Sequence, residues 1–132
     1  MFDSIEDFIY VADDFVEHFR DGKLDYSVES LNLLEEYLDD LSCFGLEDEA
    51  LNNAAETIGS YIFETARRCY GGEYTWSEEY GQPMLVTVTP ELSVAIMAFD
   101  KVKKRLKSES KESISLYISK YKEHIEKGKQ QK

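Results

Sequence analysis

The residues best placed to carry chemistry are a glutamate and two arginines within GSYIFETARRCYGG, residues 59–72. Glu64 precedes Arg67 and Arg68 by three and four positions, a spacing that brings a carboxylate and a guanidinium together on one helix face. A catalytic carboxylate also needs a second acid, a base or a metal ligand beside it, and the neighbouring sequence supplies none of these. We therefore expect Glu64 and Arg68 to form a structural ion pair, and we assign no catalytic residue.

Aromatic side chains are concentrated around the same segment: Tyr61, Tyr70, Tyr74, Trp76 and Tyr80. Such a group can form a wall that binds a ligand or a protein partner, or it can fill the junction between a helix and a sheet. The second interpretation is favoured, and Trp76 is expected to be mostly buried against the preceding helix. Trp76 and Tyr80 are kept as candidate partner-binding residues.

Other motifs for catalysis or ligand binding do not occur in the sequence. Cys43 and Cys69 lack CxxC spacing and a neighbouring histidine, which is typical of two reduced thiols in a cytoplasmic protein. His18 and His124 lie in helical surface patterns and are expected to be solvated. Without a glycine-rich phosphate loop, His/Cys metal spacing or a Ca²⁺ loop, the chain is expected to bind neither a cofactor nor a metal.

The 132-residue chain has a formal net charge of −12, and its acids are concentrated in the first half. Residues 1–56 contain seventeen acids but only Arg20 and Lys23 as bases, whereas residues 57–132 contain ten acids and thirteen bases. The acidic half would repel nucleic acid and anionic membranes. No apolar run approaches the ~20 residues that span a bilayer. The expected partner is therefore a basic protein, with no nucleic acid and no membrane.

Four acids of the second predicted helix are candidates for contact with that partner: Glu35, Glu36, Asp39 and Asp40. Like charges at i, i+4 destabilise a helix by about 0.2–0.5 kcal/mol per pair, so these acids require an explanation. Either the lysines within residues 101–107 neutralise them, or they are displayed to a basic partner. We expect display, because the leucine face of this helix must turn inward and the carboxylates lie opposite it.

Helical periodicity predicts three N-terminal helices, over residues 4–20, from about 27 to 41, and over 47–70. Gly71 is expected to end the third helix with a positive φ, and the small residues around Gly59 are expected to admit a neighbouring element closely.

The rest of the chain has strand and helix signals in turn. EYTWS and PMLVTVT have strand composition. Residues 92–97 fit a third strand or a helix, and a short strand followed by a helix over about 98–107 is favoured. A final amphipathic helix begins near Ile114, and the tail at 127–132 is expected to fray.

A GxYxxE motif, a Gly-Gly pair, a tryptophan and an FDKV motif follow one another along the chain: Gly59, Tyr61, Glu64, Gly71, Gly72, Trp76, Phe99, Asp100, Lys101 and Val102. In this order of elements, residues 26–121 resemble a family of small bacterial proteins of uncharacterised function. This chain departs from the family pattern at Phe63, where the family has a second glycine, and at Ala98, where it has a proline. The resemblance implies an α+β fold and transfers no activity and no catalytic residue.

These patterns predict one α+β domain over residues 1–132, in which N-terminal helices pack on a two- to three-stranded antiparallel sheet and C-terminal helices close it. The residues expected to be structural are Gly59, Glu64, Arg68, Gly71 and Gly72. The predicted function is that of a non-enzymatic, acidic protein-binding domain in the cytoplasm, such as an immunity protein or an inhibitor of a basic toxin. The alternatives are a scaffold or adaptor with an aromatic surface, and an enzyme with an unrecognised carboxylate site.

Overall fold

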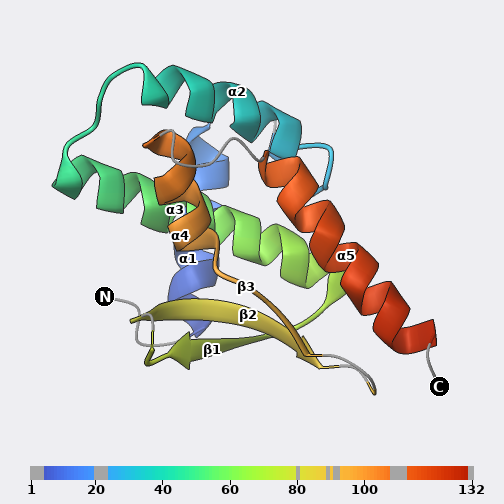
Figure 1. The fold of residues 1–132 in the computed structure, drawn as a ribbon. Coiled ribbons are helices and arrows are strands. Elements are labelled where there is room, and N and C mark those ends of the chain that lie inside the picture. The colour runs from blue at the N-terminus through green and yellow to red at the C-terminus, as the bar shows by residue number, and fades with distance from the viewer. Residues whose placement is uncertain are drawn as a thin grey trace.

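The computed structural model describes residues 5–19, 24–79, 81–88, 90, 93–107 and 113–130. Within these ranges three helices precede a three-stranded sheet and two helices follow it, which confirms the α+β prediction (Figure 1). The elements are α1 (Ile5–His18), α2 (Leu31–Ser42), α3 (Asp48–Tyr70), β1 (Glu73–Ser77), β2 (Gln82–Val88), β3 (Ser93–Ile96), α4 (Ala98–Leu106) and α5 (Ile114–Gln130).

The strands form an antiparallel meander in the order β1–β2–β3. The favoured interpretation of a short strand followed by a helix is confirmed by β3 and α4, and residue 92 lies outside the described ranges. Tyr74, Leu85 and Ile96 share the face of the sheet that turns towards the helices, where Leu85 and Ile96 are fully buried. Thr75, Met84 and the other residues in the alternate positions lie on the opposite face.

Helix α3 is the centre of the fold, and α1 and α4 cross it and pack against it (Figure 1). Every residue from Ile58 to Ala66 is buried, so this part of the helix has no solvent face. An apolar helix surrounded on all sides belongs in a core rather than on a surface. Gly59 permits the close approach of α4, because a Cβ at this position would lie 2.5 Å from Cδ1 of Phe99. The expected close approach at Gly59 is thus confirmed.

Helix α2 lies on the far side of the helical layer from the sheet and packs against α4 and α5 (Figure 1). It begins at Leu31, four residues later than the sequence predicts. Asp25 accepts hydrogen bonds from the backbone N–H (3.1 Å) and hydroxyl (2.5 Å) of Ser27. Tyr26 adopts a φ of 63°. This local turn competes with helix formation and delays the start of α2.

The chain passes from α3 into β1 through Gly71 and Gly72. Gly71 has a φ of 89°, which confirms the predicted positive value, and its N–H still donates to the carbonyl of Arg67 at 2.9 Å. Gly72 has a φ of 118°, and a Cβ there would lie 2.8 Å from both Thr87 Oγ1 and Tyr121 Oη. The second glycine is therefore needed for the approach of α5 to the sheet as well as for the turn.

Helix α5 continues to Gln130, so most of the tail expected to fray is helical; residues 131 and 132 lie outside the described ranges. Among the described residues, no helix combines the length and the apolar character needed to cross a membrane.

Candidate functional site

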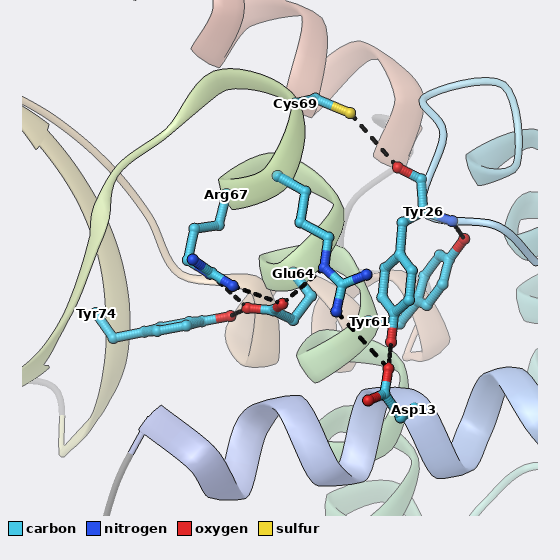
Figure 2. A network of polar contacts seen from close by, with 8 residues as sticks. Asp13, Tyr26, Tyr61, Glu64, Arg67, Cys69 and Tyr74 are labelled. Atoms are coloured by element: carbon cyan, nitrogen blue, oxygen red, sulfur yellow. Dashed lines mark hydrogen bonds and ion pairs between the residues drawn. The ribbon is translucent and has the colours of Figure 1, made fainter.

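Glu64 is fully buried on α3, and donors saturate its carboxylate (Figure 2). Arg67 donates from Nε to Oε1 at 2.7 Å and from Nη2 to Oε2 at 3.0 Å. Arg68 donates from Nε to Oε2 at 3.0 Å, and the hydroxyl of Tyr74 donates to Oε1 at 2.8 Å. The structural ion pair predicted for Glu64 and Arg68 is confirmed, with Arg67 as the bidentate partner.

The electrostatics of this group hold each side chain in one protonation state. Burial acts to raise the pKa of Glu64, but hydrogen bonds from Arg67, Tyr74 and Arg68 together lower it by more, so it lies below its ordinary value. The pKa of Tyr74 is raised far above its usual range. Burial is the largest cause, and the hydrogen bond to the Glu64 carboxylate is the second. At neutral pH the carboxylate is ionised and the phenol is protonated, which suits a structural link and not proton transfer.

Arg68 extends the network towards α1 and the segment before α2. Its Nη2 lies 3.8 Å from a carboxylate oxygen of Asp13, and its guanidinium carbon lies 3.7 Å from the ring centre of Tyr26. Tyr26 in turn donates its hydroxyl proton to Asp13. The pKa of Tyr26 is raised well above its usual range, with burial as the largest cause and this hydrogen bond as the second. The network therefore joins three segments of the chain and keeps the phenol protonated.

Tyr61 completes the network from inside the core, where it is fully buried. Its hydroxyl accepts a hydrogen bond from the backbone N–H of Tyr26 at 2.9 Å and lies 2.5 Å from Ser30 Oγ. The rings of Tyr26 and Tyr61 stack with centres 5.1 Å apart. The ring of Tyr74 likewise stacks on Phe8, at 4.7 Å. Tyr74 therefore fills the junction between the helices and the sheet, whereas Tyr26 and Tyr61 stack between α3 and the segment before α2.

Trp76 does not follow the prediction of burial, because 46% of its surface is exposed. It lies on the same face of β1 as Tyr74, but one residue from the hairpin end of the strand and opposite Pro83. Phe8 and Phe63 cover the ring of Tyr74. Trp76 lies two residues further along the strand than Tyr74, and its indole remains partly exposed. Tyr80, the other aromatic candidate, lies outside the described residues.

The four acidic candidates of α2 divide into two pairs. Arg105 of α4 binds Asp39 with Nη2 2.5 Å from Oδ1, and its Nε lies 4.0 Å from Oε1 of Glu35. Both oxygens of Glu35 also accept the backbone N–H of Ile114, at 3.1 Å each. The expectation of display is therefore wrong for Glu35 and Asp39. Glu36 and Asp40 are exposed.

The reason for this correction is the packing of α2. Its buried residues Leu31, Leu34 and Leu38 face α4 and α5, so the positions that flank them come within reach of bases on α4. The neutralising base is Arg105, which is only 17% exposed, and not one of the lysines considered from sequence. Internal compensation therefore applies to Glu35 and Asp39.

Glu35 caps the N-terminus of α5, and the Glu35→Gln substitution is expected to lower the free energy of unfolding by about 1 kcal/mol. The amide retains one acceptor but loses the charge that interacts with Arg105 and with the helix dipole. Urea unfolding at neutral pH measures this effect. Glu36→Gln is the matched control one residue along, where an exposed side chain should change stability by less than about 0.5 kcal/mol. Equal effects of the two substitutions would contradict the capping role.

A second acidic segment is the α2–α3 corner, which we define as residues 40–49. Its exposed acids are Asp40, Glu47, Asp48 and Glu49. Phe44 lies between them in the sequence and has 75% of its surface exposed. No lysine, arginine or histidine occurs between residues 24 and 66, so no base close in sequence neutralises the corner.

Two other features have some character of a ligand site. Asp14, Glu17 and His18 place one ligand atom each within 4.8 Å of one another, but all three are exposed, and Nδ1 of His18 is bonded to the carbonyl of Asp14 at 2.8 Å. A hollow of about 620 Å³ lies along β1 and β2, with Glu73 as its one charged lining residue. Neither feature has the buried polar groups that orient a small ligand.

The sequence had no signal for the partners that distant segments bring to α3. Asp13, Tyr26 and Ser30 reach the network from residues that precede it by more than thirty positions. Only the Asp-Tyr-Ser turn at residues 25–27 has a recognisable pattern, since aspartate and serine favour such turns. Comparison with known proteins finds no matching family, no matching curated protein and no matching solved structure.

Proposed function

We propose that this chain is a non-enzymatic, acidic protein-binding domain whose partner is a basic protein, and that it serves as an immunity protein or inhibitor of a basic toxin. The observation that carries the proposal is the α2–α3 corner, where an exposed phenylalanine and four exposed carboxylates occur within ten residues of the chain. Buried interface centres are enriched in aromatic residues, and charge around them selects the partner.

The charge of the molecule supports a basic partner over other classes. A net charge of −12 would attract a basic protein from a distance and raise its association rate. The same charge repels the phosphates of nucleic acid and of anionic membranes. In this proposal Phe44 inserts into an apolar pocket of the partner, while Glu47, Asp48 and Glu49 meet its lysines and arginines.

The carboxylate best suited to catalysis from sequence is unavailable to a substrate. Glu64 has no exposed surface, and both of its oxygens are occupied by donors from within the chain. The enzyme alternative therefore requires an unrecognised carboxylate site other than Glu64. Membership of the family of small bacterial α+β proteins, and a cytoplasmic location in which Cys43 and Cys69 stay reduced, are part of the same proposal.

The experiment uses the product of the neighbouring reading frame as the probe, produced separately and together with this chain. The expected results are a complex of the two proteins, and restored growth of a bacterial host in which the neighbouring product alone is toxic. The association rate should fall as salt is raised, because the attraction is screened. A neighbouring product that neither binds nor is toxic would contradict the proposal.

A variant of the corner tests its role in that complex. Phe44→Ser combined with Glu47→Gln, Asp48→Asn and Glu49→Gln is expected to weaken binding by about a hundredfold, since it removes the anchor and three charges. The matched control, Leu116→Ser with Glu123→Gln, alters an exposed apolar residue and an exposed acid on α5. Equal binding by the two variants would contradict the assignment of the corner.

A further inference from the structure

The outer edge of β1 has no paired strand among the residues that the structure describes. Within the residues that the structure describes, β1 pairs on one side only, with β2. An unpaired edge exposes backbone N–H and C=O groups to which a further strand can bind. The single tryptophan of the chain lies on this strand and is 46% exposed.

The position of Pro83 indicates which backbone groups of β1 point to the outer edge. Pro83 lies opposite Trp76 and has no N–H to donate. Hydrogen-bonded and non-hydrogen-bonded pairs alternate in an antiparallel ladder, so the Trp76–Pro83 pair takes a non-hydrogen-bonded place. The bonds to β2 then fall at the odd-numbered residues of β1. The N–H and C=O groups of Tyr74 and Trp76 point away from β2.

A second copy of β1 is complementary to these groups when the two strands run antiparallel with their centre at Thr75. Tyr74 then exchanges backbone hydrogen bonds with the partner's Trp76, and Trp76 does so with the partner's Tyr74. Glu73 faces the partner's Ser77, so the one acid of the strand opposes no other acid. Trp76 and the partner's Tyr74 lie on the same face, with Cα atoms about 5.5 Å apart, which is a favourable aromatic cross-strand pair.

We propose that this chain forms a two-fold symmetric dimer through the edge of β1, in which the two sheets join into one continuous antiparallel sheet. The half-exposed indole of Trp76 is covered by the second copy. This interface is separate from the α2–α3 corner, so the dimer does not depend on the proposed function.

The net charge gives this dimer a characteristic salt dependence. Two copies with a charge of −12 each repel one another, and salt screens that repulsion over about 8–10 Å near physiological ionic strength. The dimer should therefore strengthen as salt is raised. Binding of a basic partner should change in the opposite direction, which separates the two interactions.

Sedimentation equilibrium of the full chain, from micromolar to millimolar concentration at low and at high salt, measures the association. Because the chain has one tryptophan, its fluorescence reports directly on the interface. The emission of Trp76 is expected to shift to shorter wavelength over the same concentration range in which the dimer forms. A chain that is monomeric at every concentration and salt, or a dimer whose formation leaves the emission unchanged, would overturn the proposal.

The Thr75→Asp variant tests the register. Thr75 is exposed in the single copy, whereas in the dimer it lies opposite the partner's Thr75 with Cα atoms about 4.5 Å apart. Two carboxylates at that distance are expected to weaken the dimer about tenfold or more. Ala95→Asp is the matched control, because it adds the same charge on the same sheet face but on β3. Equal dimer affinities of the two variants would exclude this register.

A crosslink gives a second, independent reading. In a chain with Cys43→Ser and Cys69→Ser, the Thr75→Cys variant is expected to form an interchain disulfide under mild oxidation, because the Cα separation falls within the disulfide range. Ala95→Cys in the same background should remain reduced at the same concentration. Crosslinking that is equally fast at both positions would show that it reflects collision and would count against the interface.

Discussion

Glu64→Gln is expected to lower the free energy of unfolding by about 2–3 kcal/mol. Glutamine preserves the shape of the side chain but removes the charge. It also replaces one acceptor oxygen by an N–H₂ group, which then faces the N–H and O–H donors that bind the carboxylate. The hydroxyl of Tyr74 and the guanidinium of Arg67 then compete for one acceptor. The loss stays below that of a fully buried ion pair, because Arg67 and Arg68 are 35% and 40% exposed and can turn to water.

The pH dependence of this effect follows from the lowered pKa of Glu64 in the folded chain. A carboxyl group whose folded pKa lies below its unfolded value of about 4.3 stabilises the fold above that pH. The stabilisation is lost as the pH falls through the folded pKa. The difference in stability between the wild type and Glu64→Gln is therefore expected to be full at neutral pH and to shrink below about pH 4.

Urea unfolding at a series of pH values measures both parts of this prediction. Glu36→Gln makes the same chemical change at an exposed site of α2 and controls for the general loss of an acid. Tyr74→Phe removes a single hydrogen bond to Glu64 and should cost about 1 kcal/mol. If Glu64→Gln unfolded at the same urea concentration as Glu36→Gln, the network would not stabilise the fold.

Gly59→Ala is expected to destabilise the chain by about 2 kcal/mol, although alanine is the better helix former by about 1 kcal/mol. The added Cβ would lie 2.5 Å and 3.0 Å from two ring atoms of Phe99 and 3.3 Å from its backbone nitrogen. The ring can move only by disturbing its packing with Phe63 and Phe8, and the backbone contact requires α3 and α4 to separate.

A double-mutant cycle assigns this cost to the contact. Phe99→Leu removes the ring atoms that overlap the new methyl group, so Gly59→Ala should be less damaging in the Phe99→Leu background than in the wild type. Urea unfolding of the four proteins gives the coupling energy. Additive effects would place the cause elsewhere in α3, and a stabilised Gly59→Ala variant would show that the two helices separate at little cost.

The order and type of the elements could be predicted from the sequence. Apolar residues at helical spacing and two strand-like runs were sufficient for the α+β class, because these patterns depend on which faces a segment can bury. Gly71 could be predicted because the need for a positive φ at the end of a helix is local. The pairing of Glu64 with Arg67 and Arg68 was also predictable, since residues within one helical turn meet whatever the tertiary fold.

Which charges are neutralised and which aromatic rings are buried depends on how the helices and strands pack. Asp39 is bound by Arg105, 66 residues further along the chain, and Glu35 caps a helix that begins 79 residues later. No local pattern encodes such pairs, because they depend on the packing of α2 against α4 and α5. The same reason explains the exposure of Trp76. A large aromatic side chain favours burial, but burial requires a neighbouring element to cover it. Phe8 stacks on Tyr74, whereas Trp76 is 46% exposed. Periodicity fixes the face that a segment buries, whereas the partner on that face is set by how the segments pack in three dimensions.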